Sequence, residues 1–225
     1  MTDILLINPN SSGTVTRGMD RTARAMLPAG LSLQTLDLPD SPATIASDED
    51  VARAGLGVLE LARRTPARVV ITGCFSDPGL DLLRAMEGGP VAIGCQEAAL
   101  LSAMARADRF GVIALGPKSI PRHLRKMRMM GIEGRLAGEL HLSGCSAEAP
   151  MRDPEAYALI RTRAEELGAM GAGAIVLGCA GMAPIRARLE AETGLAIVDP
   201  VSAAMAQAIA AVQGDPGFDF DTEAE

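Results

Sequence analysis

The feature that most constrains the fold of this chain is an apolar run that ends in Gly-Cys and occurs twice. Residues 69–73 lead into Cys74, and residues 174–178 lead into Cys179, 105 positions later. A continuous apolar run of this length, rich in β-branched residues, is typical of a strand buried on both faces of a parallel sheet. A helix-start pattern follows each cysteine. The repeat predicts that both halves of the chain contain the same strand–turn–helix unit.

Two further landmarks repeat with almost the same offset. Asn8-Pro9-Asn10-Ser11 corresponds to Gly116-Pro117-Lys118-Ser119, and residues 92–95 correspond to residues 196–199. Between the landmarks, strand patterns alternate with helix patterns, as they do in α/β proteins. The sequence therefore predicts an α/β fold with two pseudo-symmetric open lobes, mostly parallel sheets and an active site in the cleft between the lobes.

The expected lobes divide the chain into three parts. Residues 1–97 together with 200–213 are predicted to form the first lobe, and residues 98–199 the second. Residues 214–225 begin with a helix-stopping Gly-Asp-Pro-Gly sequence and are acidic, so we predict a disordered tail there.

Composition argues against several classes of function. Hydrophobic residues make up 48% of the chain, which is typical of a globular protein, yet no apolar run approaches the ~20 residues of a membrane span. A net charge of −7 and an aromatic content of 2% disfavour nucleic-acid binding. Residues 1–7 lack the pattern of a signal peptide. We expect a cytoplasmic protein that binds a small molecule, and neither nucleic acid nor a membrane.

The supply of metal-ligating and lysine side chains argues against a cofactor. The four cysteines, at positions 74, 95, 145 and 179, have no Cys-x-x-Cys spacing, and only two histidines could add ligands. The two lysines, Lys118 and Lys126, lie in one helical stretch, which disfavours a pyridoxal phosphate Schiff base. We therefore expect no metal and no other cofactor, and we interpret Cys95 and Cys145 as structural residues.

Cys74 and Cys179 are the candidate reactive residues. Each is expected at the carboxyl end of a parallel strand, facing the N-terminus of the next helix, where backbone amides favour a thiolate. A thiolate on one face of a cleft can take a proton from a carbon acid while a thiol on the opposite face returns one, which inverts a single stereocentre. The alternative is that both cysteines are buried and structural. Their equivalent positions in the two halves favour the reactive interpretation.

Three motifs carry a resemblance to a known family. The motifs are Asn8-Pro9-Asn10-Ser11, Gly73-Cys74-Phe75-Ser76-Asp77-Pro78-Gly79-Leu80 and Leu177-Gly178-Cys179-Ala180-Gly181-Met182. They resemble the signatures of the hydantoin racemase group of the Asp/Glu racemase superfamily, and the resemblance extends over residues 3–212. It implies a cofactor-independent racemase with Cys74 and Cys179 as acid/base residues. It also implies a two-lobed α/β fold, a homo-oligomer, and a 5-substituted hydantoin or allantoin as substrate.

Amino-acid racemases of the superfamily carry Cys-Asn-Thr and Gly-Cys-Thr-His in the corresponding places. This chain has Cys74-Phe75-Ser76 and Cys179-Ala180-Gly181 instead, which favours a cyclic diamide over glutamate or aspartate. The alternatives within the superfamily are a maleate cis-trans isomerase, an aspartate/glutamate racemase and an arylmalonate decarboxylase. A decarboxylase needs only one proton donor, so two aligned cysteines fit it less well. A non-catalytic two-lobed binding protein for a small molecule is the alternative from another class.

We predict that the substrate contacts residues beside the cysteines and in the first loop of each half. These residues are Asn8, Pro9, Asn10, Ser11, Phe75, Ser76, Ser119, Ala180 and Gly181. Their amides and hydroxyls offer groups for imide oxygens or for an enolate. Alternatively, Asn8 and Asn10 only turn the chain and cap a helix, and Phe75 only packs. We interpret Asp77-Pro78-Gly79 as a helix-entry turn and not as a catalytic carboxylate.

A basic segment remains open to two interpretations. Arg122, His123, Arg125, Lys126 and Arg128 lie on one predicted helix, and we interpret them as a solvated face. The alternative is contact with an anionic group of the substrate or with a second subunit. His123 could act as a base only with a partner that the sequence does not reveal.

Overall fold

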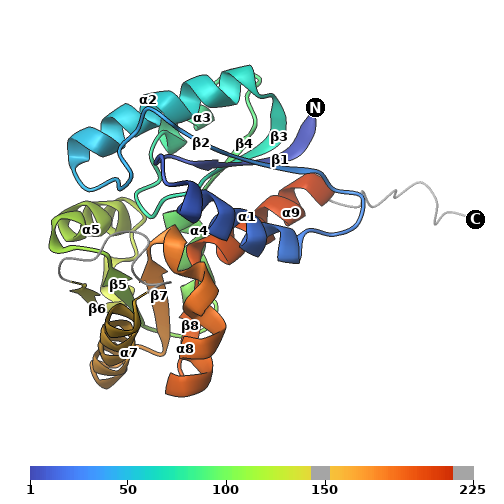
Figure 1. Ribbon diagram of the computed structural model, residues 1–225. Helices are drawn as coiled ribbons and strands as arrows, with labels where there is room; N and C mark the ends of the chain where they lie inside the picture. The colour runs from blue at the N-terminus through green and yellow to red at the C-terminus, as the bar shows by residue number, and fades with distance from the viewer. Residues whose placement is uncertain (143–152, 215–225) are drawn as a thin grey trace, which may run out of the picture.

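The computed structural model of the protein describes residues 1–142 and 153–214. Two parallel four-stranded sheets form its framework (Figure 1). In spatial order, the first sheet consists of β2 (Leu33–Asp37), β1 (Thr2–Asn8), β3 (Ala67–Thr72) and β4 (Val91–Gly94), and the second of β6 (Leu136–His141), β5 (Phe110–Ala114), β7 (Ala174–Gly178) and β8 (Ala196–Val198). Adding four to each strand number of the first sheet gives the order of the second. The predicted fold with two pseudo-symmetric α/β lobes is confirmed.

Helices connect the strands and cover both faces of each sheet. They are α1 (Gly13–Met26), α2 (Asp48–Arg64), α3 (Leu80–Arg84), α4 (Cys95–Met104), α5 (Ile120–Met129), α7 (Pro154–Ala169), α8 (Arg186–Thr193) and α9 (Pro200–Gln213), with the 3-10 turns η1 (Pro117–Ser119), η2 (Glu133–Arg135) and η3 (Ala180–Ile185). The segment after Cys179 begins as η3 and becomes α-helical only at Arg186. Pro184 lacks the N–H that an α-helix interior needs, which explains the division.

Side-chain caps fix the beginnings of α1 and α2. Ser12 Oγ accepts a hydrogen bond from the Val15 N–H at 3.2 Å. Ser47 Oγ accepts from the Asp50 N–H at 3.0 Å, and the Asp50 carboxylate accepts from the Ser47 N–H at 2.8 Å. Each such cap stabilises a helix by about 1 kcal/mol. The caps also anchor the loops that precede these helices, and both loops reach the pocket described below.

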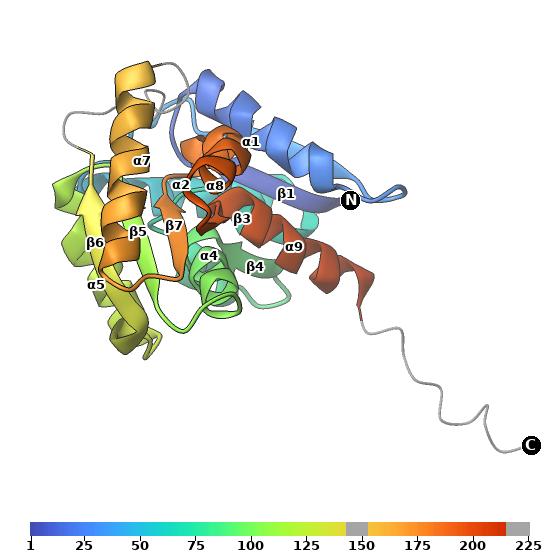
Figure 2. The same ribbon diagram turned by 90° about the horizontal axis from the view of Figure 1, so that it is seen from below.

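A central apolar core joins the two sheets. Helices α1, α4 and α9 lie between them, as Figures 1 and 2 show. In β1, Ile4 and Leu6 face this central core, whereas Leu5 and Ile7 face an outer core formed with α2 and α3. The second sheet has an outer core of its own, formed with α7 and α8. Burial on both faces is the reason that the strands are continuously apolar in sequence.

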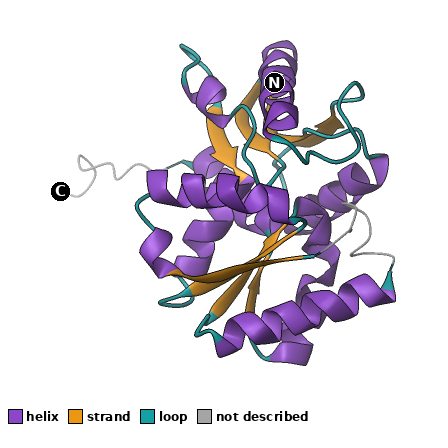
Figure 3. Ribbon diagram, turned by 90° about the vertical axis from the view of Figure 1, so that its left-hand side faces the viewer, coloured by secondary structure: helices purple, strands orange, loops and turns teal. Residues whose placement is uncertain are grey.

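Helix α9 follows the second sheet in sequence but packs against α1, α4 and β3. Figure 3 shows the two sheets with helices on both sides of each.

Within the described ranges, no helix combines the length and the apolar character needed to cross a membrane. Cys145 and the predicted tail from residue 215 onward lie outside the described residues.

Candidate active site

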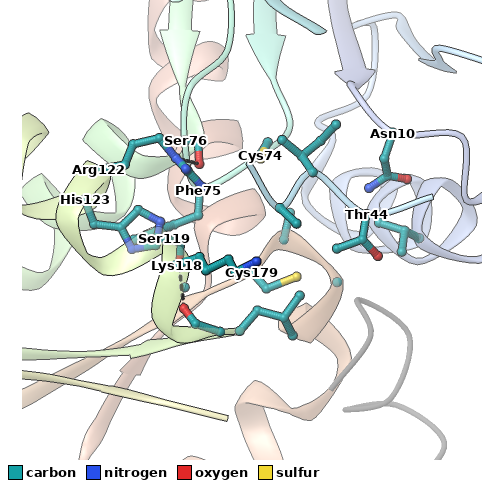
Figure 4. A pocket seen from close by; sticks show the side chains of 18 of the residues that line it. Asn10, Thr44, Cys74, Phe75, Ser76, Lys118, Ser119, Arg122, His123 and Cys179 are labelled. Atoms are coloured by element: carbon teal, nitrogen blue, oxygen red, sulfur yellow. Dashed lines mark hydrogen bonds between the residues drawn. The ribbon is translucent and has the colours of Figure 1, made fainter. Parts of the chain in front are cut away.

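A pocket of about 390 Å³ lies where the carboxyl ends of the two sheets meet, in the cleft between the lobes. Figure 4 shows Cys74 and Cys179 within it. The first lobe contributes Asn10, Val15, Thr44, Ile45, Ala46 and residues 73–76, and the second contributes residues 115–119, Arg122, His123 and residues 178–181. This volume is typical of small-molecule sites.

The glycine before each cysteine is required because a neighbouring strand approaches it closely. A Cβ atom on Gly73 would lie 2.8 Å from the carbonyl oxygen of Ile7 in β1, and it would also collide with the Met19 side chain. A Cβ atom on Gly178 would lie 2.6 Å from the carbonyl oxygen of Ile113 in β5. Contacts this short would displace backbone, so only glycine fits at either strand end. The two glycines thereby fix where each cysteine leaves its sheet.

The backbone makes the same turn after both cysteines. The carbonyl oxygen of each cysteine accepts from the N–H three residues later, at 3.0 Å in both lobes. The second N–H after the cysteine, that of Ser76 in one lobe and of Gly181 in the other, lowers the pKa of the thiol. The duplication has therefore given the two thiols equivalent backbone donors.

Burial outweighs these donors at both thiols, although part of each side chain is open to the pocket. Removal from water raises the pKa of the Cys74 thiol, and it raises the pKa of the Cys179 thiol to about 12. Hydrogen bonds from Ser76 and the charge of Arg122 oppose the rise in the pKa of Cys74, whereas Gly181 alone opposes it at Cys179. The backbone amides lower the pKa of each thiol, as the sequence predicts, but desolvation is the larger effect and the pKa of each thiol is raised overall.

In the loop at the end of β1, residues 8–11, some side chains line the pocket and others support the loop. Asn10 lines the pocket, and its side-chain oxygen accepts from Asn8 Nδ2 at 2.9 Å and from the Ser12 N–H at 2.8 Å. These bonds leave the Asn10 amide nitrogen available to the pocket (Figure 4). The Asn8 side chain is fully buried and holds the loop together. Pro9 and Ser11 are absent from the pocket lining. Of the four contacts predicted here, the structure places Asn10 at the pocket and Asn8 beneath it as a support.

The other predicted contact residues do line the pocket. They are Phe75, Ser76, Ser119, Ala180 and Gly181. The Ser119 hydroxyl donates to the Gly116 carbonyl at 2.9 Å, so its oxygen can accept but its proton is already used. Phe75 both lines the pocket and packs, because its ring meets that of His123 edge-on with centroids 5.0 Å apart.

The basic segment on α5 has two sides with different environments. Arg122 and His123 are buried and line the pocket, whereas Arg125 is exposed. Arg122 donates through Nε to Ser76 Oγ at 2.9 Å and through a terminal nitrogen to the Asp48 carboxylate at 2.6 Å. The interpretation of this segment as a solvated face is therefore wrong for Arg122 and His123, because α5 turns one side toward the first lobe.

The partner that His123 needs is Glu139 in β6. The Nδ1 atom of His123 lies 2.5 Å from Oε1 of Glu139, and both side chains are 2% exposed. The other Glu139 oxygen is buried and has no hydrogen-bond partner among the residues described. This pair fixes the plane of the imidazole ring at the pocket wall. The two residues lie on different elements, 16 positions apart, so no local sequence pattern could have joined them.

Asp77 supports the site from outside the pocket. Its carboxylate accepts from the N–H groups of Gln96 at 2.7 Å and Glu97 at 3.1 Å, in the first turn of α4. Desolvation raises the pKa of Asp77 to about 7, against the lowering effect of these two bonds. Asp77 also has a φ of 44°, an unusual value for a residue other than glycine. The turn after Cys74 is thus tied to α4, and Asp77 is a structural residue as the sequence suggested.

Sequence reasoning missed the loop of residues 44–46 and Lys118. The Lys118 side chain points into the pocket (Figure 4), and within residues 1–142 and 153–214 it has no ion-pair partner. Its signal was present in the internal repeat, where Lys118 aligns with Asn10. Among the described residues that line the pocket there is no Asp or Glu. The described residues also include no group of three side chains placed to hold a metal ion.

Comparisons with known proteins agree with this geometry. The sequence profile described as Asp/Glu/Hydantoin racemase matches residues 4–208. A hydantoin racemase of Paenarthrobacter aurescens is 32% identical over 208 residues, covering 89% of this chain and 87% of that protein. A hydantoin racemase of Rhizobium meliloti is 33% identical over 222 residues, covering 91% and 86%. The structure of an allantoin racemase from Klebsiella pneumoniae superposes with a TM-score of 0.85 at 30% identity, covering 93% of this chain and 86% of the other.

Proposed function

The chain belongs to the Asp/Glu/hydantoin racemase family and is a racemase; from this premise we propose that it inverts the stereocentre of a 5-substituted hydantoin or of allantoin, with Cys74 and Cys179 as its two acid/base residues. The named activities of the similar proteins support this substrate class. The observation that carries the proposal is the pair of equivalent thiols in one pocket between two lobes.

The reaction follows from the two faces of a planar ring. The C5–H bond of a hydantoin is adjacent to a carbonyl group, so its electron pair can move into an enolate as the proton leaves. A thiolate on one face accepts that proton and becomes a thiol. The thiol on the other face gives its own proton to C5 and becomes a thiolate. No atom is oxidised or reduced, and the enzyme ends with its proton on the opposite cysteine.

The enolate needs hydrogen-bond donors or positive charge near its oxygen. The Asn10 amide nitrogen and the Lys118 ammonium group supply both, and they occupy aligned positions of the two halves. The absence of carboxylates from the described lining means that no like charge opposes the anion. His123, held by Glu139, adds a ring nitrogen to the same wall.

A cyclic diamide suits this pocket better than an amino acid with two carboxylates. Glutamate or aspartate would bring two negative charges, and Arg122 is already bonded to Asp48. Among the described residues of the lining, Lys118 is the cation that has no partner. Phe75 and the neighbouring apolar residues provide a wall for the flat, uncharged ring of a hydantoin.

Polarimetry tests the proposal directly. Single enantiomers of several 5-substituted hydantoins, allantoin, aspartate and glutamate are incubated with the wild-type protein and with Cys74→Ala and Cys179→Ala. We expect the wild type to racemise a hydantoin or allantoin, and each variant to lose about 10²- to 10⁴-fold of that rate, the usual contribution of an acid/base group.

The matched control is Cys95→Ala. Cys95 is fully buried in the central core and does not line the pocket, so this variant should keep its activity. Full activity in either pocket variant would refute the two-cysteine mechanism. Racemisation of aspartate or glutamate in place of the cyclic substrates would refute the substrate class.

A further inference from the structure

The two cysteine turns differ in one side chain, two residues after the cysteine. This position is Ser76 after Cys74 and Gly181 after Cys179. Both residues place a backbone N–H where it lowers the pKa of the preceding cysteine, and the Ser76 side chain lowers the pKa of Cys74 in addition. Glycine has no such group. A single hydroxyl therefore breaks the symmetry of the two lobes in favour of negative charge on Cys74.

Arg122 determines the direction in which this hydroxyl donates. Its Nε–H donates to Ser76 Oγ at 2.9 Å, as Figure 4 shows. A guanidinium group has only donors, so the serine oxygen must accept in this bond. The serine keeps its own proton for a second acceptor, and the Cys74 thiol lies two residues earlier on the same turn. The Ser76 side chain and the charge of Arg122 both lower the pKa of this thiol.

Asp48 holds the guanidinium group in place from the other lobe. Its carboxylate accepts from Arg122 at 2.6 Å and from Arg125 at 3.2 Å. Hydrogen bonds from these two arginines keep the pKa of Asp48 below its usual range, so the carboxylate stays charged. Asp48 begins α2 of the first lobe, whereas Arg122 and Arg125 belong to α5 of the second, which lies beside α2 in Figure 1. The Arg122 side chain is only 8% exposed.

We infer that Arg122 is a positioning residue that acts through Ser76 to stabilise negative charge on Cys74, so that Cys74 ionises before Cys179 in the free enzyme. The inference rests on the proposed two-cysteine function, and it adds the order in which the two thiols ionise. The enantiomer whose C5–H bond faces Cys74 reacts with the more readily formed of the two thiolates. The opposite enantiomer needs the less favourable state, with the thiolate on Cys179.

Other ionisable groups also face Cys74, and the test must separate them from Arg122. Asp77, on the same turn, disfavours negative charge on the sulfur. The remaining groups are Cys95 on α4, Cys179 at the start of η3, Lys118 on η1 and His123 on α5. None of these is hydrogen-bonded to Ser76 in the described structure. The arginine variants below leave all of them in place.

Alkylation rates of the individual cysteines provide the test. The full-length protein is treated with iodoacetamide over a pH series, and mass spectrometry of peptides gives the rate at Cys74 and at Cys179 separately. In the wild type we expect Cys74 to react faster than Cys179. Arg122→Met should slow Cys74 about tenfold at a given pH, equivalent to one pKa unit, and should leave Cys179 unchanged.

Three further variants make the result specific. Arg125→Met removes the other arginine on Asp48 and serves as the matched control, with Cys74 expected to keep its wild-type rate. Ser76→Ala keeps the bond between Arg122 and Asp48 but removes the hydroxyl, so Cys74 should again react more slowly. Arg122→Lys keeps the charge but cannot hold the same two bonds, so its Cys74 rate should fall between those of the wild type and Arg122→Met.

Several outcomes would overturn the inference. One is an unchanged ratio of Cys74 to Cys179 rates in both Arg122→Met and Ser76→Ala, and another is equal slowing of the two cysteines. If Arg122→Met does not fold, Ser76→Ala alone decides. Because alkylation does not require turnover, a racemase assay in which Cys74→Ala stays active would refute the proposed function without affecting the measured role of Arg122.

Discussion

The strand ends at Cys74 and Cys179 have the same backbone conformation, but the side chains around the two thiols differ. Both follow a glycine that a neighbouring strand forces to remain glycine, and both have the same turn with an N–H directed at the sulfur. Cys74 has in addition the Ser76 hydroxyl and the charge of Arg122, which comes from the other lobe. The two thiols thus have equivalent positions in the duplicated fold, but the side chains around them give them different electrostatic surroundings.

Backbone symmetry and chemical symmetry have separate causes in this molecule. The backbone of each turn follows from strand packing within one lobe. The electrostatics of Cys74 follow from contacts between lobes, because Asp48 and Ser76 belong to the first and Arg122 to the second. A racemase needs an acid/base group on each face of the substrate, but the two groups need not have equal pKa values.

The pH dependence of racemisation probes what the two thiols have in common. Burial raises both thiol pKa values, so at neutral pH the form with one thiolate is the minority form. Its population grows as pH rises, until the lower of the two pKa values is reached. We expect kcat/KM to increase about tenfold per pH unit from about pH 7 to about pH 8.5, in both directions of the reaction. A flat profile over this range would show that a thiolate is already formed at neutral pH.

Substitution of the two glycines probes the symmetry of the backbone. Gly73→Ala and Gly178→Ala each place a Cβ atom against a carbonyl oxygen of the adjacent strand. Each should lower the free energy of unfolding by about 1–3 kcal/mol, the usual cost of overpacking, as measured by denaturant unfolding. Gly134→Ala is the control, because a Cβ atom there meets nothing within 4 Å. If only one of the two pocket glycines were sensitive, the strand ends would not be equivalent.

Most of the fold was predictable because its signals are local. Continuous apolar runs predicted the parallel strands, and the repeated Gly-Cys pair predicted the duplication. Three of the site's features were not predictable, because they depend on contacts between distant elements. These are the pairing of His123 with Glu139, the bonds of Arg122 to Ser76 and Asp48, and the entry of residues 44–46 into the pocket.

Burial is the physical factor that two of the predictions from sequence did not include. The sequence suggested that helix-terminal amides would favour thiolates, and that the first loop would contact the substrate through Asn8, Pro9 and Ser11. In both cases burial decides the outcome, since it raises the pKa values of the thiols and encloses Asn8 completely. A sequence pattern predicts which groups lie near each other better than it predicts how far each group is exposed to solvent. The homo-oligomer and the cytoplasmic location stay predictions.

Isotope exchange in heavy water shows whether one acid/base cysteine acts on each face of the substrate. Each single variant keeps one cysteine, which can remove the C5 proton from its own face and return a deuteron to that face without inversion. We predict that Cys179→Ala exchanges one enantiomer of the hydantoin and that Cys74→Ala exchanges the other, as followed by NMR together with polarimetry. Exchange of the same enantiomer by both variants, or racemisation by either at the wild-type rate, would contradict the account.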